Sequence, residues 1–433
     1  MKTKLLIVLA TLLATSCQSL LVDVTDDPEA FSVSSPQPKE QLTKVALSDA
    51  QKGYVSGANK MAFRFLREMY EGKSLVCSPL SLQYALGMTA NGASGETLQE
   101  IIDFLGYGSD GIDALNAYCK LLLDQLPALD LNVALKLTDA LLVNQDFPLL
   151  STFKTTVRDN YYAAIANMTF DNPNAVAKAI NDWAKQNTNG FIDKLMDPEE
   201  ISPDAVAFLM NALYFKAKWA GSKENPMFRE ETTVAGSFTD DAGAVSKQKM
   251  MNSTGYYRYA EMDGFRVLEL PYADRKFCMY FLLPDKRDLK GMLDKLQNVS
   301  WGAVLGSMKD DATVSVKIPK FDVENKFYLK EKLEKLGVVR AFQQGGKAQF
   351  DRMFEPQAAD YNYYISKVIQ KARISVAEWG TEAAAVTVVE MSKNAAAPPM
   401  GKIVEFYADH PFVFLIGEPV SQTILFEGAF TGK

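Results

Sequence analysis

The segment from residue 372 to residue 399 constrains the fold most strongly, because a strand there leads into a run that can itself become a strand. Residues 372–377 alternate between apolar side chains and polar or small ones, the period of two that is typical of a half-buried strand. After Gly380 the run TEAAAVTVVEM is small and β-prone, and the breaker pair Pro398-Pro399 ends the segment. A potential strand is therefore expected directly after an established one.

The two faces of this run differ in character when it is written as a strand. Glu382 and Glu390 fall on one face, whereas the face that begins with Thr381 and ends with Met391 carries no charge. A strand with one face on a core and one in water needs this pattern, and small Ala side chains lose little rotamer entropy on burial. The pattern fits an ordinary surface hairpin arm or a loop that can enter a sheet, and these residues alone leave both interpretations open.

Periodicity and breaker residues predict helices and strands along the rest of the chain. Helices are predicted at residues 58–70, 98–105, 115–126, 148–162, 175–188 and 329–336, and a further helix is predicted to begin at Ser78-Pro79. Strands are predicted at residues 135–143, 205–215, 256–259, 266–270, 277–283, 313–318, 363–369, 403–407, 412–416 and 423–426. The fold is expected to start near Ser48.

Composition and charge narrow the classes of function. The chain has 433 residues, a net charge of −7 and no basic run, which argues against nucleic-acid binding. His410 is the single histidine available to a Ser–His–Asp or Cys–His catalyst, so a His-based hydrolase is not expected. Cys77, Cys119 and Cys278 lie in apolar stretches typical of buried thiols, and no ligand spacing predicts a metal site or a cofactor.

The first residues resemble a targeting segment. Lys2 and Lys4 precede an apolar run at residues 5–13, the pattern of a secretory signal. Cys17 follows Ala-Thr-Ser, which resembles a bacterial lipoprotein box. We therefore expect a lipoprotein signal peptide at residues 1–16, a lipidated Cys17 with a flexible acidic, Pro- and Ser-containing tether at 17–47, and a folded domain at 48–433. The alternative is a plain signal peptide with a cysteine nearby.

Five motifs occur in order along residues 49–433. They are CSPLSL from residue 77, INDWAKQNTNG from residue 180, NALYFKAKW from residue 211, FLLPD from residue 281 and GTEAAAVT from residue 380. Together they resemble motifs of the serpins, a family of protease inhibitors, and the last resembles the hinge of the serpin reactive-centre loop. The resemblance implies an α+β fold in a single domain, with several helices packed on three mostly antiparallel or mixed β-sheets and an exposed loop at about 380–400.

The resemblance also implies a function and the residues that carry it. Serpins are suicide-substrate inhibitors: a serine protease, or a papain-like cysteine protease, cleaves the loop, which then inserts as a new strand of the central sheet. The implied hinge residues are Glu378, Gly380, Thr381, Glu382, Ala383, Ala384, Ala385, Val386 and Thr387. The alternative is a non-inhibitory serpin that serves as a surface binding module. Such members commonly carry bulky or charged residues or Pro in the hinge.

The position of the reactive bond follows from the same resemblance. The residue before the cleaved bond is usually the seventeenth counted from the hinge glutamate, which gives Asn394–Ala395 here. Lys393 would suit a trypsin-like enzyme at the neighbouring bond Lys393–Asn394. Expected partners are trypsin-, elastase- or subtilisin-like proteases. The inhibitor is expected to be a monomer that is exported and lipid-anchored to a bacterial membrane, at the outer membrane or cell surface, with the periplasmic face as the alternative.

A buried polar cluster is expected beneath the central strand at residues 205–215. Only Asn211 interrupts its apolar sequence, and an unsatisfied buried amide would cost about 1–3 kcal/mol, so Asn211 needs partners. The resemblance places it in the serpin shutter with Ser78, Ser81 and Gln370, where the family usually has His at the last position. It places Trp219 at the breach, where the loop first enters the sheet. The alternatives are a polar network that merely fixes the core and a plain core aromatic.

Overall fold

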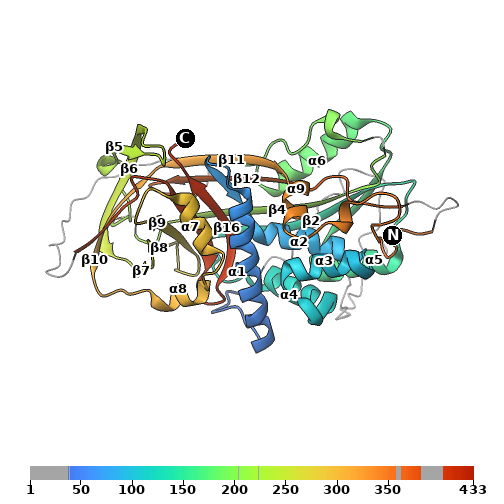
Figure 1. Ribbon diagram of the computed structural model, residues 1–433, viewed down its shortest axis with the longest axis horizontal. Helices are drawn as coiled ribbons and strands as arrows, with labels where there is room; N and C mark the ends of the chain where they lie inside the picture. The colour runs from blue at the N-terminus through green and yellow to red at the C-terminus, as the bar shows by residue number, and fades with distance from the viewer. Residues whose placement is uncertain (1–37, 39, 203, 223, 357–361, 382–402) are drawn as a thin grey trace, which may run out of the picture.

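The computed structural model describes residues 38, 40–202, 204–222, 224–356, 362–381 and 403–433. The chain folds into three β-sheets and a set of helices. Most of the helices lie at one end of the molecule and most of the shorter strands at the other (Figure 1). The predicted fold class, several helices packed on three mostly antiparallel or mixed sheets, is confirmed.

Most of the helices follow the predicted periodicity, but the two at residues 289–296 and 301–307 were not predicted. Within the described residues they are α1 Asp49–Met69, α2 Pro79–Asn91, α3 Gly95–Leu105, α4 Gly111–Gln125, α5 Ser151–Tyr161, α6 Pro173–Asn187, α7 Leu289–Leu296, α8 Trp301–Ser307 and α9 Lys330–Lys335. Ser48 caps α1 through a reciprocal capping box with Gln51. The expected start of the fold near Ser48 is wrong, because Val45 is already buried in the core and the Leu42 N–H donates to the Ala128 carbonyl. Gly106, with φ of 86°, ends α3 in the left-handed conformation that glycine favours.

The largest sheet contains the hinge of the predicted loop. In spatial order it consists of β11 Phe321–Tyr328, β12 Ile369–Ala377, β13 Gly380–Thr381, β4 Ala207–Lys218, β2 Ala134–Asn144 and β3 Ala164–Met168. Helix α2 packs on one face of this sheet and α6 on the other, where they belong to separate apolar cores (Figure 1). We call this sheet the large sheet.

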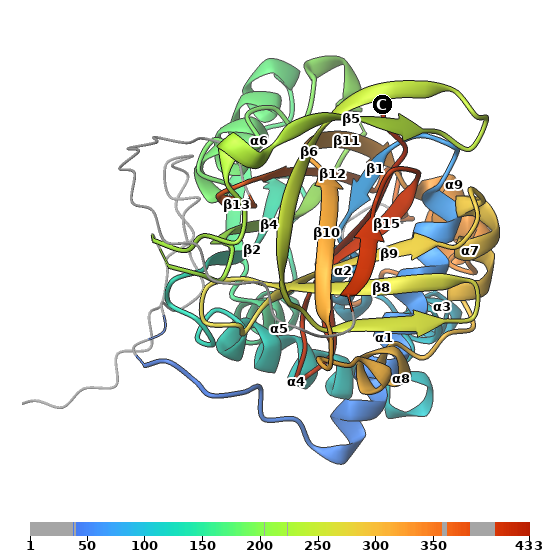
Figure 2. The ribbon, with the colours of Figure 1, turned by 90° about the vertical axis from the view of Figure 1, so that its left-hand side faces the viewer.

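The other two sheets form the opposite end of the molecule (Figure 2). One has the order β1 Leu75–Cys77, β16 Thr423–Phe430, β15 Phe412–Glu418, β9 Cys278–Pro284, β8 Phe265–Pro271 and β7 Tyr259–Met262. The other has the order β14 Ile403–Tyr407, β10 Thr313–Pro319, β6 Val245–Tyr256 and β5 Val234–Thr239. Every residue of β9, β15 and β16 is buried, so these strands form the interior of that end.

Two strand predictions are wrong. The strand predicted at residues 363–369 is irregular chain up to Val368, and only Ile369 belongs to β12. Its apolar side chains pack against the core while Ile365 N–H donates to the carbonyl of Ala341, so the alternation serves packing without a strand ladder. The strand predicted at 256–259 is in fact a junction, because β6 ends at Tyr256 and β7 begins at Tyr259.

Candidate functional site

The first two residues of the predicted loop already lie inside the large sheet. Gly380 and Thr381 form β13, which pairs antiparallel with β12 on one side and with β4 on the other. Gly380 has φ of 147°, and a Cβ at this position would lie 2.1 Å from the carbonyl oxygen of Ala217 on β4. Only glycine therefore allows the chain to pass so close to β4 as it turns into the sheet.

An aromatic pair holds Thr381 in place. The Thr381 side chain is only 2% exposed, and its hydroxyl hydrogen-bonds with the hydroxyl of Tyr272. The Tyr272 ring stacks on Trp219 with 4.6 Å between ring centroids. Trp219 in turn donates from Nε1 to the Ala377 carbonyl at 2.8 Å and from its backbone N–H to the Trp379 carbonyl at 3.2 Å. Trp219 thus contacts the chain on both sides of Glu378.

Glu378 anchors the turn between β12 and β13. Its carboxylate lies 2.6 Å from the Nζ of Lys320, and the side chain is buried. Burial opposes ionisation of this carboxyl, but hydrogen bonds from Lys320 and Thr233 outweigh that effect, and the pKa of Glu378 lies below its usual range. The glutamate is therefore charged at neutral pH and tied to the loop that precedes β11.

A cleft continues the path of β13 down the large sheet. Within the described residues β13 is the only strand that pairs with both β12 and β4, and no ladder joins those two strands to each other. Below Thr381 the space between them opens into a cleft of about 620 Å³. Residues 207–212 of β4 and 369–371 of β12 form its sides, α2 its floor, and α6 with the chain that follows it its roof. A further strand that extended β13 would run along this route.

The predicted shutter residues meet at the floor of this cleft. Gln370 accepts from the backbone N–H of Ser78 at 3.1 Å and donates to the Ser78 carbonyl at 2.9 Å. The Ser78 hydroxyl caps α2 by accepting from Ser81 N–H, and it donates to the Leu425 carbonyl at 2.7 Å. The Ser81 hydroxyl donates to the side-chain oxygen of Asn211. The structure therefore connects β12, α2 and β4 through these four side chains.

Asp139 belongs to the same cluster, although sequence reasoning missed it. It lies opposite Asn211 in the ladder between β2 and β4, and Asn211 Nδ2 donates to its Oδ1 at 2.9 Å. Its Oδ2 is buried without a hydrogen-bond partner. Burial raises the pKa of Asp139 to about 7, although the bond from Asn211 opposes the shift. The lone acid within the apolar run of residues 135–143 was the available signal, and it gives the cluster a group that titrates.

Several predicted site residues lie outside the described residues. They are Cys17 and, in the loop, Glu382, Ala383, Ala384, Ala385, Val386, Thr387, Lys393, Asn394 and Ala395. Of the predicted hinge, the structure places Glu378, Gly380 and Thr381. The three cysteines Cys77, Cys119 and Cys278 are buried free thiols, as predicted.

Other features of the described residues serve the fold. The ring of His410 lies between two oxygen atoms: the Asp409 carboxylate is 2.8 Å from Nδ1, and the Pro284 carbonyl is 2.8 Å from Nε2.

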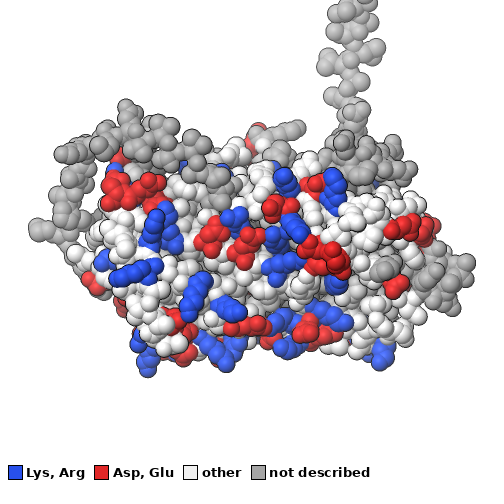
Figure 3. All heavy atoms as spheres, turned by 90° about the horizontal axis from the view of Figure 1, so that it is seen from above, with Lys and Arg blue, Asp and Glu red and all other residues white. Residues whose placement is uncertain are grey.

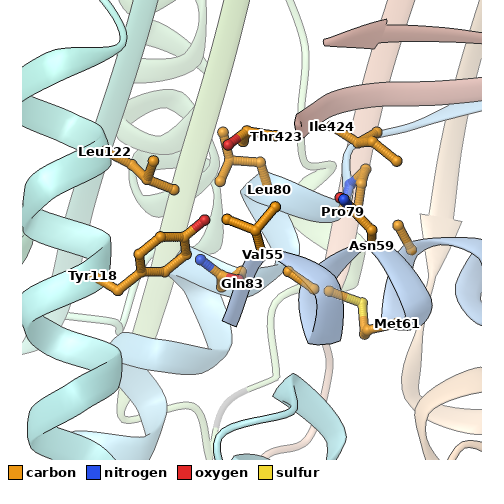
Figure 4. Close-up of a pocket in the computed structure, with 12 residues that line it drawn as sticks. Val55, Asn59, Met61, Pro79, Leu80, Gln83, Tyr118, Leu122, Thr423 and Ile424 are labelled. Atoms are coloured by element: carbon orange, nitrogen blue, oxygen red, sulfur yellow. The ribbon is translucent and has the colours of Figure 1, made fainter. Parts of the chain in front are cut away.

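No cluster of three or more potential metal ligands occurs among the residues that the structure places. None of the described helices combines the length and apolarity that crossing a bilayer requires. A hollow between α1, α2, α4 and β16 measures only about 10 Å³ (Figure 4), room for one water at most.

Comparisons with known proteins agree with this geometry. The family model described as Serpin (serine protease inhibitor) matches residues 56–432. The chain is 31% identical over 373 residues to serine protease inhibitor 42Dd of Drosophila melanogaster, covering 86% of this chain and 94% of that one. It is 30% identical to neuroserpin of Homo sapiens, covering 84% and 87%. The solved structure of tengpin, a thermophilic serpin, in its native state is similar with a TM-score of 0.78 at 28% identity, covering 92% and 97%.

In the large sheet the start of the predicted loop lies between β12 and β4, two strands that no ladder of the described residues joins to each other. The chain belongs to the serpin family. Proteins of this family are mostly protease inhibitors rather than catalytic enzymes. Tengpin in its latent state is also similar, with a TM-score of 0.73 and 26% identity.

Proposed function

We propose that this protein is a suicide-substrate inhibitor of serine proteases, and of papain-like cysteine proteases. The target's nucleophile attacks the carbonyl carbon of the residue before the reactive bond, and the amine of the next residue leaves. The severed loop, esterified or thioesterified to the enzyme, then inserts between β12 and β4. The bound protease is carried along the sheet and distorted before water can release it.

The observation that supports this proposal is the position of β13 at the head of the cleft. Gly380 and Thr381 already pair with both neighbouring strands, so the next residues need only extend an existing strand downward. About 14 inserted residues at about 3.3 Å each would carry the protease roughly 45 Å. Each new backbone hydrogen bond contributes about 0.5–1.5 kcal/mol, and burial of the uncharged face adds to that.

We propose Lys393, Asn394 and Ala395 as the residues at the reactive bond. Asn394–Ala395 has the spacing from Glu378 that the family uses, and Lys393–Asn394 offers a basic residue to trypsin-like enzymes. We further propose that the protein is exported, that Cys17 carries a lipid, and that the residues between Cys17 and the packed chain at Leu42 tether the domain to a bacterial membrane. A reach on the order of 30 Å follows if the tether behaves as a coil.

The test is incubation of the protein with trypsin, elastase, subtilisin and papain. We expect covalent complexes that survive detergent and heat, together with a released C-terminal peptide whose N-terminus begins at Asn394 or Ala395. Cleavage without any stable complex would favour the alternative of a non-inhibitory binding module. Cleavage only after Gly401 would show that the proposed reactive bond is wrong.

A further inference from the structure

The chain that follows α6 lies over the cleft and contacts both of its sides. We call residues 188–202 the crossover. Its Ile192 and Met196 pack with Trp183 of α6 against Met210 of β4, in the apolar core on the outer face of the large sheet. The amide of Asn181 on α6 accepts from the backbone N–H groups of residues 195 and 196 at 2.7 and 2.8 Å. One side of the crossover is therefore bound to α6 and β4.

The other side of the crossover is bound to β11 and β12, and Glu200 is the centre of that attachment. Lys326 of β11 donates to both Glu200 carboxylate oxygens, at 2.7 and 2.6 Å. The hydroxyl of Tyr328, also on β11, donates to the same carboxylate. Lys367, in the chain that leads into β12, donates to the Glu200 backbone carbonyl. Three side chains from the far side of the cleft thus converge on one residue.

The environment of Glu200 makes this attachment stronger than an ordinary surface ion pair. Its side chain is 15% exposed and that of Lys326 is 24% exposed, whereas both members of the Lys178–Asp182 pair on α6 are more than half exposed. Exposed pairs contribute little, and charge-assisted hydrogen bonds in partly buried geometry contribute more. The Asp197 backbone N–H also donates to Glu200 at 2.6 Å, which fixes the carboxylate in position.

Two further contacts tie the crossover to β12. Lys371 donates to the Lys194 backbone carbonyl at 2.8 Å, and the Arg373 guanidinium lies 4.9 Å from the centre of the Phe191 ring. Acidic and basic side chains alternate across this face of the molecule (Figure 3). The crossover therefore bridges β4 on one side and β12 on the other, directly above the space that a new strand would fill.

We propose that Glu200 latches the crossover over the cleft and that release of this latch limits the rate at which the loop inserts. The proposal rests on the proposed function, because it concerns the same insertion. A strand that starts at β13 must pass beneath the crossover to reach residues 207–212, so the crossover has to lift or slide from β11 and β12. The contacts to Lys326, Tyr328 and Lys367 must then break, whereas those to Asn181 can persist. Glu200 is thus a positioning residue.

The experiment compares Glu200→Gln with Glu199→Gln in the full chain. Glu199 is the exposed neighbour, so the control makes the same charge change one position away. A synthetic peptide with the sequence of residues 381–394 serves as the inserting strand, and its incorporation is followed by native gel. We expect Glu200→Gln to take up the peptide on the order of tenfold faster, the effect of losing one charge-assisted attachment, and Glu199→Gln to match the parent.

The charge-swapped double variant Glu200→Lys with Lys326→Glu separates a latch from a simple loss of stability. We expect it to be slower than Glu200→Gln but faster than the parent, because the swapped ion pair can form whereas a lysine at position 200 cannot accept from Tyr328 or from the Asp197 N–H. We also expect added salt to speed uptake by the parent more than by Glu200→Gln. Faster uptake in Glu199→Gln as well, or equal rates in the parent and Glu200→Gln, would overturn the proposal.

Hydrogen exchange of the crossover amides tests the latch without any insertion. Residues 190–202 should exchange faster in Glu200→Gln than in Glu199→Gln. One outcome is that exchange is faster in Glu200→Gln but no variant takes up peptide or traps a protease. The proposed function then fails, and Glu200 is an attachment of the crossover without a role in insertion. If peptide enters every variant at one rate and exchange is unchanged, the latch fails and the inhibitory function stands.

Discussion

Asp139 is a buried carboxylic acid in the large sheet, and its protonation links the stability of the fold to pH. Its pKa of about 7 in the folded protein exceeds the usual value for an unfolded Asp of about 3.9, so the folded state holds the proton more tightly. Stability from this group is therefore present below about pH 4 and is lost as the pH rises toward 7.

Asp139→Asn should remove this contribution to the pH dependence. The amide keeps an acceptor for Asn211 Nδ2 and carries no charge, so we expect a higher melting temperature than the parent at pH 8 and little difference at pH 4. The measurement is thermal unfolding across that range, with the exposed Asp146→Asn as the control. Because Glu427 is also buried with a raised pKa, the informative quantity is the difference between variant and parent. The same difference in melting temperature between variant and parent at pH 4 and at pH 8 would contradict the prediction.

A side chain added at Gly380 would collide with the neighbouring strand β4. Gly380→Ala would place a methyl group against the Ala217 carbonyl and force a left-handed conformation that alanine disfavours. We expect β13 to leave the sheet and the variant to be cleaved by target proteases without forming stable complexes. The ratio of complex to cleaved product on a denaturing gel measures this. Thr381→Ser, which keeps the hydroxyl for Tyr272, should behave like the parent.

At the scale of elements, the alternation of the loop predicts which positions tolerate charge. Thr387 falls on the face that begins with Thr381, whose side chain is buried in the sheet. Thr387→Arg should turn the inhibitor into a substrate, because insertion would bury an unpaired charge at a cost of several kcal/mol. The matched control is Glu382→Arg on the opposite face, at a position that already carries a charge and comes before the part of the path that the crossover covers, and it should retain inhibition. If both variants trap the protease equally well, the assignment of faces is wrong.

Local sequence predicted the elements best where buried and less buried residues alternate one by one along a strand. Gln370, Ala372, Ile374 and Val376 are all buried along β12, as the period of two indicated. Strands β5 and β6 were missed because few of their residues are buried, namely Phe238 in β5 and Met250 and Met251 in β6. Strand β11 was missed although its first four residues alternate between buried and exposed. Strands β5 and β6 pair with each other as neighbours in sequence, but β6 also pairs with β10 and β11 pairs with β12, and local patterns carry little information about such distant partners.

The candidate site likewise contains residues that local sequence predicted and contacts that it could not predict. Ser78 was predictable because it caps a helix through a local signal, and Asn211 because it interrupts an apolar strand. The cleft between β12 and β4, the attachment of Glu200 to β11 and the placement of Asp139 opposite Asn211 all depend on tertiary pairing. No window of local sequence contains both partners of those contacts, so only the folded chain reveals them.

At the scale of the whole molecule, the empty path below β13 predicts that cleavage stabilises the protein. Filling it with about 14 residues adds hydrogen bonds worth about 0.5–1.5 kcal/mol each. Because 1 kcal/mol shifts the melting temperature of a large domain by about 2–4 °C, we expect a rise of tens of degrees. Thermal unfolding of protein nicked within the loop, compared with the intact protein, measures it. A nicked sample that melts no higher would contradict the insertion of the loop.

The strands beyond the loop determine what happens to the severed piece. Strand β14 pairs with β10, and β15 lies between β16 and β9 in the interior of its sheet. A cut at Asn394–Ala395 therefore yields two polypeptides, of which the shorter is interwoven with the longer along three strands. The nicked protein should migrate as one particle in gel filtration and separate only in denaturant, so proteolysis here acts as a switch of state and leaves the assembly whole.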